Sequence, residues 1–255
     1  MTDAGPDFLT VGEGDAARQI AVRVREGNGP PVVWLGGFRS DMTATKAAAL
    51  DAWATREKRA LVRFDYAGHG ASGGSFARCT ISSWLEDAQA VVAAHTHEAP
   101  ILVGSSMGGW IACLAARGRA VRGEKTAGLV LVAPALDFTE DLIWEQMDET
   151  ARAALLRDGV LKRPSEYAPE PAPITLGLIE DGRRNTLLRG PFDPACPVHI
   201  LQGMRDPDVP YTHALKTLGR LPAAGTVLTL IADGDHRLSR PQDIARLVAA
   251  VAGIA

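Results

Sequence analysis

The sequence predicts an α/β fold: a mostly parallel, doubly wound sheet of about eight strands, with helices on both faces and a helical lid inserted into it. Three observations support this prediction. Short apolar runs alternate along the chain with longer amphipathic stretches. Most of the apolar runs are continuous, which is typical of strands buried on both faces. One long stretch, residues 137–192, interrupts the alternation.

The individual elements follow from these patterns in chain order. A period-two alternation in RQIAVRVREG predicts a strand at 18–27. Apolar runs predict further strands at 31–37, 60–68, 100–105, 127–135, 196–203 and 225–233. Amphipathic stretches predict helices at 43–60, 80–97, 107–118, 212–221 and 241–254. Thr80 or Ser82 is suited to cap the second helix, Gly118 to end the third, and Pro241 to stand near the start of the last.

Residues 137–192 contain helical patterns and a proline-rich run but no clear strand. This stretch is too long for an ordinary connection between two elements of a compact domain. We therefore expect one domain over residues 1–255, with a lid inserted at 137–192 between two strands of the sheet.

Composition excludes several classes of function. A net charge of −3 and a pI near 6.1 argue against a nucleic-acid partner, which usually requires a basic face. We expect no membrane span, no secretory signal and no transit peptide, and hence a cytoplasmic location. Cys79, Cys113 and Cys196 are widely spaced, which indicates neither a disulfide framework nor a zinc site. We expect no metal and no cofactor.

The stretch ILVGSSMGGW, residues 101–110, contains the pattern G-x-S-x-G between a predicted strand and a predicted helix. This is the context of a nucleophile elbow, a turn so tight that the central serine is strained and exposed. Gly104 and Gly108 stand at both flanking offsets of Ser106 but not of Ser105. Ser106 is therefore the candidate nucleophile.

A nucleophilic serine needs a base, and the base needs an acid that orients it. In doubly wound hydrolases these residues follow in the order serine, acid, histidine. His236 lies in a polar loop between the last predicted strand and the last helix, where this order requires the base. Asp206, just beyond a predicted strand, is the favoured acid, with Asp208 and Asp137 as alternatives.

The oxyanion that forms during acyl transfer needs two backbone N–H donors. The residue after the nucleophile, Met107, is one candidate, and Phe38 in the glycine-rich loop after the strand at 31–37 is the other. Within the lid, Trp144, Met147 and Tyr167 are candidates for lining a substrate pocket, although such residues often only pack a lid onto the body.

Several segments together resemble serine α/β-hydrolases, namely GGFRSDMTATKA, RFDYAGHGASGG, ILVGSSMGGW, GVLKRPSEY, HILQGMRDPDVP and DGDHRL. The resemblance is narrower still to the group of mitochondrial acyl-glucuronide esterases and palmitoyl-protein thioesterases with its bacterial relatives. It implies Ser106 as nucleophile and His236 as base. It implies Asp206 as acid, because the motif G-x-x-D-x-x-V-P is met by Gly203, Asp206, Val209 and Pro210.

The leading hypothesis is a serine hydrolase that cleaves small-molecule carboxylic esters or thioesters through an acyl-enzyme. An alternative keeps the same three residues but cleaves a carbon–carbon bond or transfers the acyl group. A third hypothesis is a non-catalytic ligand-binding protein, since folds of this kind also serve as binding scaffolds.

Overall fold

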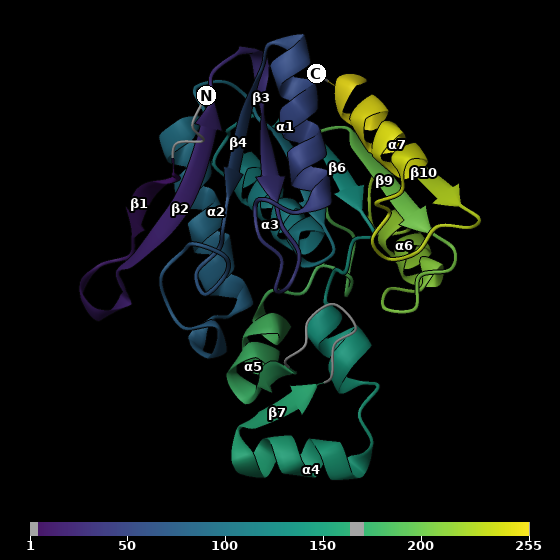
Figure 1. Cartoon of the computed structure of the whole chain (residues 1–255). Coiled ribbons are helices and arrows are strands. Elements are labelled where there is room, and N and C mark those ends of the chain that lie inside the picture. Colours follow the sequence, from purple (N-terminus) through teal and green to yellow (C-terminus); the bar gives the residue numbers. More distant parts are fainter. Residues whose placement is uncertain (1–4, 164–170, 255) are drawn as a thin grey trace.

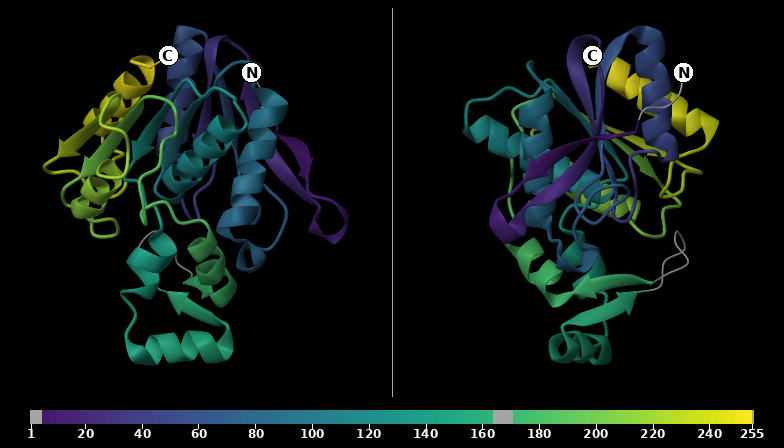
Figure 2. Two further views of the ribbon diagram at one scale, coloured as in Figure 1. Left: turned by 180° about the vertical axis from the view of Figure 1, so that it is seen from behind. Right: turned by 60° about the vertical axis from the view of Figure 1, so that its left-hand side comes forward.

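The structure is a computed structural model that describes residues 5–163 and 171–254. Among these residues the main sheet has eight strands, with helices on both faces (Figures 1 and 2). From one edge to the other the strands are β1 (Asp7–Val11), β2 (Arg18–Arg25), β4 (Arg59–Phe64), β3 (Asn28–Leu35), β5 (Ile101–Ser105), β6 (Gly128–Val132), β9 (Val198–Gly203) and β10 (Thr226–Ile231).

The sheet is mostly parallel. Strand β2 pairs antiparallel with both β1 and β4. All the other neighbouring pairs among the described strands of this sheet are parallel. The predicted fold class is therefore confirmed. Strand β1 was not predicted, because its five residues, DFLTV, lie mostly exposed at the edge and show no clear periodicity.

Two helical layers cover the sheet. Helices α1 (Thr45–Glu57) and α7 (Pro241–Ala252) pack on one face. Helices α2 (Ile81–His95), α3 (Met107–Val121) and α6 (Tyr211–Leu218) pack on the other. Alternation along a strand divides the core, since Trp34 of β3 joins the core under α1 and α7 while its neighbour Leu35 joins the core under α2 and α3.

The helix limits agree with the predicted caps except at Gly118. Thr80 caps α2, accepting the N–H of Ser83 at 3.4 Å. Helix α3 continues past Gly118 to Val121, so the prediction that this helix ends at Gly118 is wrong. A glycine inside a helix costs only about 1 kcal/mol relative to alanine, and packing of the buried face of α3 outweighs that cost. Two short 3₁₀ helices, η1 (Gly14–Ala16) and η2 (Phe76–Arg78), lie in loops.

Between β6 and β9 the chain leaves the sheet. This part contains a π-helical segment, η3 (Thr139–Trp144), then α4 (Glu149–Asp158), β7 (Val160–Arg163), β8 (Ala172–Thr175) and α5 (Leu176–Arg184). The helices of a helical lid are present, but strands β7 and β8 form an antiparallel pair, so the expectation of no strand in this part is wrong. Strands of four residues give too short an apolar run to be distinguished from loops in the sequence.

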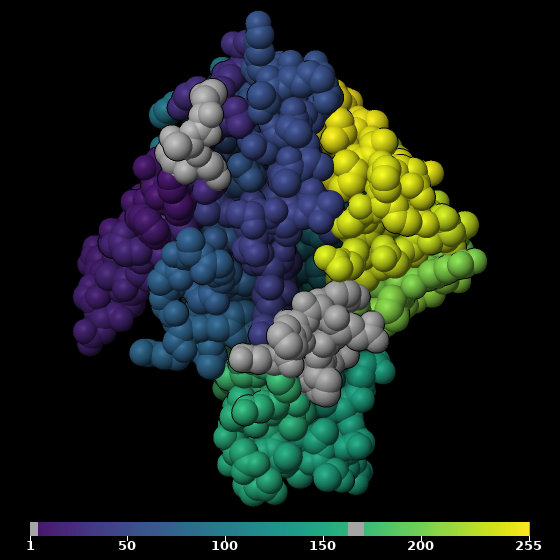
Figure 3. Space-filling view, in the orientation of Figure 1, coloured from purple at the N-terminus to yellow at the C-terminus, as the bar shows by residue number. Residues whose placement is uncertain are grey.

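The inserted part forms a lobe beyond the edge of the sheet where the parallel strands end (Figures 1 and 3). Two buried carboxylates hold its return segment in place, Asp137 from the start of the inserted part and Asp181 through a contact with the body. Asp137 accepts the N–H groups of Leu187 and Leu188 at 2.8 and 2.9 Å. Asp181 of α5 accepts both the N–H and the hydroxyl of Ser82 at 2.8 Å, at the start of α2.

Candidate active site

Ser106 lies in a strained turn between β5 and α3. Its φ of 55° and ψ of −118° are rare for a residue with a side chain. Three backbone hydrogen bonds hold the conformation: Ser106 N–H donates to Val132 at 2.9 Å, and its carbonyl accepts from Gly109 at 2.9 Å and Ala135 at 3.1 Å. Such a turn places the hydroxyl at the N-terminus of a 15-residue helix, whose unpaired N–H groups favour negative charge.

Glycines on both sides make this turn possible. A Cβ atom at Gly104 would lie 2.3 Å from the carbonyl oxygen of Gly108. A Cβ atom at Gly108 would lie 2.1 Å from the carbonyl oxygen of Leu35. Neither distance is tolerable, because the obstructing atoms belong to the backbone. The two flanking glycines are therefore required for β3, β5 and α3 to meet at this point.

His236 and Asp206 are hydrogen-bonded to each other. Nδ1 of His236 lies 2.8 Å from Oδ2 of Asp206. A carboxylate can only accept here, so Nδ1 carries the proton and Nε2 is left as an acceptor in the neutral ring. The side chain of Asp206 is fully buried, whereas that of His236 is 15% exposed. This arrangement leaves one ring nitrogen of His236 able to take a proton.

The loops that carry the pair are packed against each other. Oδ1 of Asp206 accepts the N–H groups of Asp208 at 2.9 Å and Val209 at 2.8 Å, and Gln202 donates to Oδ2 at 3.2 Å. Gly203 allows the close approach, since a Cβ atom there would lie 2.4 Å from the carbonyl oxygen of Gly234. Asp206 therefore cannot turn away without losing several hydrogen bonds.

The other two candidate acids have different surroundings. The carboxylate of Asp137 is fully buried and bonded to Leu187 and Leu188 at the end of the inserted part. Asp208 lies near the pair but is exposed. Within the described ranges, Asp206, Asp208 and His236 are also the one acidic and histidine cluster with ligand atoms within 4.8 Å of one another. Because Asp206 already bonds Nδ1 of His236, this cluster is explained without a metal.

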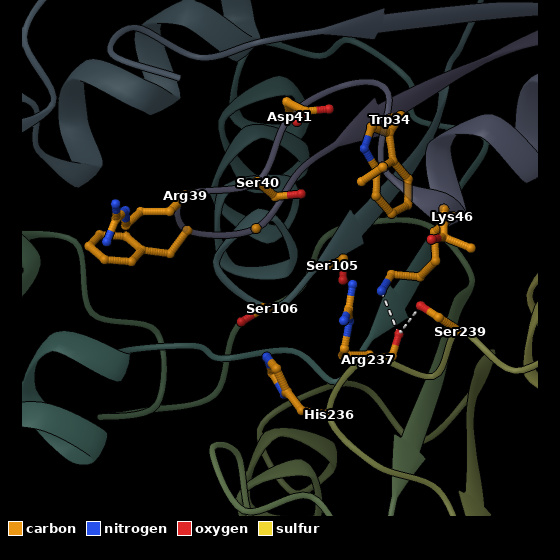
Figure 4. A pocket seen from close by; sticks show the side chains of 14 residues that line it. Trp34, Arg39, Ser40, Asp41, Lys46, Ser105, Ser106, His236, Arg237 and Ser239 are labelled. Atoms are coloured by element: carbon orange, nitrogen blue, oxygen red, sulfur yellow. Dashed lines mark hydrogen bonds between the residues drawn. The ribbon is translucent and has the colours of Figure 1, made fainter. Parts of the chain in front are cut away.

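Ser106 and His236 line one cavity of about 250 Å³. In Figure 4 the ring of His236 points a nitrogen toward Ser106. Gly37 and Phe38, from the loop after β3, line the same cavity. The backbone of that loop passes close to the serine, because a Cβ atom at Gly37 would lie 3.5 Å from Cβ of Ser106. The structure thus brings Ser106, His236 and Phe38 together, with the buried Met107 following the serine in α3.

Three cationic residues, Arg39, Lys46 and Arg237, and the acidic Asp41 also line this cavity. Lys46 donates from Nζ to the carbonyl of Arg237 at 2.5 Å, and Ser239 donates to the same oxygen (Figure 4). Burial and the nearby charge of Arg237 lower the pKa of Lys46 to about 8. The buried Nε1–H of Trp34 faces no acceptor among the described residues. The side of the cavity where Lys46 and Arg237 meet is therefore rich in donors and positive charge.

Two residues that support the loop after β3 were missed by the sequence reasoning. Nε2 of His69 accepts the N–H of Arg39 at 3.0 Å. Asp65 accepts the N–H of Met42 at 2.7 Å and that of Ala71 at 2.8 Å. Both residues stand in DYAGHGAS, just after β4. The signal was a polar, glycine-rich segment at the carboxyl end of a buried parallel strand, where functional loops gather.

The proposed pocket residues of the lid lie apart from this cavity or outside the described residues. The ring of Trp144 is covered by two guanidinium groups, of Arg183 at 4.6 Å and Arg152 at 5.5 Å. Met147 packs, partly buried, against the main core. Neither residue is among those lining the cavity that holds Ser106. Tyr167 falls in 164–170, which the structure does not describe.

Fold and site geometry together define the class: the chain is an α/β-hydrolase. A comparison with family models matches residues 32–169 to the family described as serine aminopeptidase, S33, which is more than half of the chain. The chain belongs to this family, and the predicted resemblance to serine α/β-hydrolases is confirmed.

The comparisons also identify individual relatives. Palmitoyl-protein thioesterase ABHD10, mitochondrial, of Bos taurus is 32% identical over 230 residues, which cover 90% of this chain and 74% of the relative. The crystal structure of a proposed hydrolase from Agrobacterium vitis S4 has a TM-score of 0.95 and 51% identity, covering 98% of both chains. Alpha/beta hydrolase domain-containing protein 10 from mouse has a TM-score of 0.87 and 27% identity, covering 97% of this chain and 98% of the other. The names of these relatives agree with the prediction of an ester or thioester hydrolase.

A search of the described residues for helices long and apolar enough to span a membrane finds none.

Proposed function

We propose that the chain hydrolyses carboxylic esters or thioesters through an acyl-enzyme on Ser106. The observation that carries the proposal is that a strained serine and the ring of the hydrogen-bonded His236–Asp206 pair line one cavity. A serine hydroxyl is a weak nucleophile unless a base takes its proton, and this arrangement supplies the base and the acid that orients it.

In the first half of the reaction, Nε2 of His236 takes the proton of Ser106 while Oγ bonds to the carbonyl carbon of the substrate. The carbonyl oxygen becomes an oxyanion, for which the N–H groups of Phe38 and Met107 are the proposed donors. Asp206 stabilises the imidazolium that forms. When the tetrahedral intermediate collapses, the bond to the leaving oxygen or sulfur breaks, and His236 protonates that atom.

In the second half, water replaces the leaving group. His236 takes a proton from water, and the resulting hydroxide bonds to the acyl carbon. Collapse of this second intermediate breaks the bond to Oγ, and the proton returns from His236 to Ser106. The products are a carboxylic acid and an alcohol or thiol, and each step balances with protein groups and water alone.

The cationic lining favours one placement of the substrate. Because Lys46 and Arg237 lie together in one part of the cavity, an apolar acyl chain is unfavourable there. We assign this part to the leaving group. The thioesterase name of the Bos taurus relative supports a thioester leaving group. We further propose that residues 137–192 act as a lid within a single domain over 1–255.

Initial rates on matched esters and thioesters, with acyl chains from acetyl to palmitoyl, test the proposal against Ser106→Ala. The proposal requires turnover by the wild type, an inert variant, and stoichiometric release of acid and of alcohol or thiol. Two folded proteins that are equally inactive would contradict it and favour carbon–carbon cleavage or binding. Release of the acyl group to an added alcohol rather than to water would indicate acyl transfer.

A further inference from the structure

His69 is a buried histidine outside the proposed triad. It is 4% exposed, and both ring nitrogens have partners. Nε2 lies 3.0 Å from the backbone nitrogen of Arg39, and Nδ1 lies 3.1 Å from the carbonyl oxygen of Ala67. A backbone N–H can only donate and a carbonyl can only accept, so the ring is neutral with its proton on Nδ1. Burial lowers the pKa of His69 to about 4, which keeps this form at neutral pH.

The hydrogen bond from Arg39 acts on a tight turn. The N–H of Ser40 donates to the carbonyl of Gly37 at 3.0 Å, so residues 37–40 form a β-turn with Phe38 and Arg39 at its centre. Arg39 has a φ of 60°, which a type II turn requires at this position and which usually selects glycine. A type I turn would avoid the positive φ by rotating the peptide plane between Phe38 and Arg39. His69 opposes that rotation, because the N–H of Arg39 would then lose its acceptor.

The side chain of Phe38 is fixed by the same surroundings. Its ring lies 4.9 Å from that of Phe76 and 5.9 Å from that of Trp84, centre to centre. The ring of His69 lies 5.1 Å and 5.5 Å from the same two rings. The ring of His69 therefore contacts the turn at the backbone N–H of Arg39. It also packs against Phe76 and Trp84, the same rings that contact the side chain of Phe38.

We propose that His69 is a positioning residue for the oxyanion hole: by accepting the N–H of Arg39, it anchors the peptide that follows Phe38 and thereby fixes the position of the turn whose preceding peptide carries the N–H of Phe38. The inference rests on the proposed function. His69 does not touch the substrate and takes no proton. Its effect is on the geometry of one oxyanion donor, where a misplacement of about 1 Å can cost about 100-fold in rate.

The test compares His69→Phe with His69→Gln. Phenylalanine keeps a ring among Phe76 and Trp84 but offers no acceptor. Glutamine is neutral and offers both an acceptor and a donor, so it can bond Arg39 and Ala67 in place of the imidazole. His199→Phe is the control, because His199 is a half-buried histidine on β9 that bonds Thr229, away from the site.

We expect His69→Phe to lower kcat by about 30-fold or more with KM changed less than about threefold, as for loss of an oxyanion donor. Affinity for a trifluoromethyl ketone, whose serine adduct carries an oxyanion, falls by a similar factor. His69→Gln recovers most of kcat, and His199→Phe retains it. Rates are expressed per folded molecule, measured by circular dichroism, so that a loss of fold is not counted as a loss of positioning.

Unchanged kcat and ketone affinity in His69→Phe would overturn the inference while leaving the proposed function intact. So would a loss that vanishes per folded molecule, or a His69→Gln variant as slow as His69→Phe. The rate of phosphonylation of Ser106 by a fluorophosphonate gives the same comparison without a substrate, because its phosphoryl oxygen uses the same donors. A wild type that neither turns over esters nor reacts with the probe refutes the proposed function, and this role of His69 with it.

Discussion

The carboxylate of Asp206 shows how single residues build this site. It accepts four hydrogen bonds: from Asp208 and Val209 on one oxygen, and from Gln202 and His236 on the other. The backbone bonds fix the carboxylate, and the fixed carboxylate orients the imidazole. The orientation of the His236 ring therefore depends on the turn at 206–209. The spacing of polar and apolar residues in this turn is visible in the sequence.

Replacement of Asp206 tests this role against its neighbour. We expect Asp206→Asn to lower kcat by about 1,000- to 10,000-fold, because an amide can stabilise the wrong tautomer of His236 and cannot stabilise its positive charge. Asp208→Asn, which changes an exposed carboxylate two residues away, is expected to stay within a few fold of wild type. Steady-state kinetics on one ester decide between them. Equal losses in both variants would contradict the assignment of Asp206.

Replacing a glycine of the nucleophile elbow tests whether the turn at Ser106 requires a residue without a side chain. We expect Gly108→Ala to abolish reaction with a fluorophosphonate and to lower the unfolding temperature, since its Cβ atom would lie 2.1 Å from the carbonyl oxygen of Leu35. Gly118→Ala in the same helix is the control. Its Cβ atom would meet only the ends of the Gln89 and Arg122 side chains, at 3.4 and 3.5 Å, so this variant should be as stable as wild type or more so. Comparable damage at both positions would contradict the account of the elbow.

Among the helices and strands, those with a strong local sequence pattern could be predicted from the sequence. The continuous apolar runs of β3, β5 and β6 are strong signals, and the strand–turn–helix around Ser106 located the candidate nucleophile. Strand β1 is exposed, and β7 and β8 are too short, so these strands depend on pairing with partners that no local pattern reveals.

The residues of the candidate site also divide into those with a local sequence signal and those whose role depends on a contact between distant segments. Ser106, His236 and Asp206 each lie at the end of a predicted strand, where a parallel sheet gathers its functional loops. His69 and Asp65 lie in an equally visible loop, but their role depends on a contact with the loop after β3. That contact arises because β3 and β4 are neighbours in the sheet, which chain order alone does not fix.

The inserted part is attached to the body by a contact between two helices, and replacing Asp181 tests this attachment. Asp181→Ala removes the acceptor that links α5 to the start of α2 and should lower the free energy of unfolding by about 1–3 kcal/mol. We also expect faster proteolysis within the inserted part and a higher KM. Asp158→Ala is the control, because its carboxylate pairs with Arg157 on the surface of α4 and should leave the unfolding temperature unchanged. Proteolysis at the wild-type rate in Asp181→Ala would contradict this attachment.

At the scale of the whole molecule, the buried His69 makes the free energy of unfolding depend on pH. The pKa of His69 is about 4 in the folded chain and 6.5 without burial. Between these values the unfolded chain binds the proton and the folded chain does not, so this residue's contribution to stability rises with pH from 4 to 6.5 and is lost on acidification. The full contribution is at most about 3 kcal/mol.

Urea unfolding at several pH values measures this effect. The difference in unfolding free energy between wild type and His69→Phe should grow as pH rises from 4 to 6.5 and stay constant above that range. Taking this difference cancels the contributions of the other buried titratable groups to the pH dependence. Asp65 and Asp87 are two of them, and burial raises their pKa values. A difference that does not depend on pH would show that His69 is not held neutral by the fold.

Covalent labelling distinguishes a Ser106 nucleophile that His236 activates from a serine that has no such base. The wild type and His236→Ala are treated with a fluorophosphonate, and the modified peptide is identified by mass spectrometry. We expect a single label on Ser106, formed at least about 1,000-fold more slowly in the folded His236→Ala variant than in the wild type. A label on another residue, or equal labelling rates in the two proteins, would contradict it.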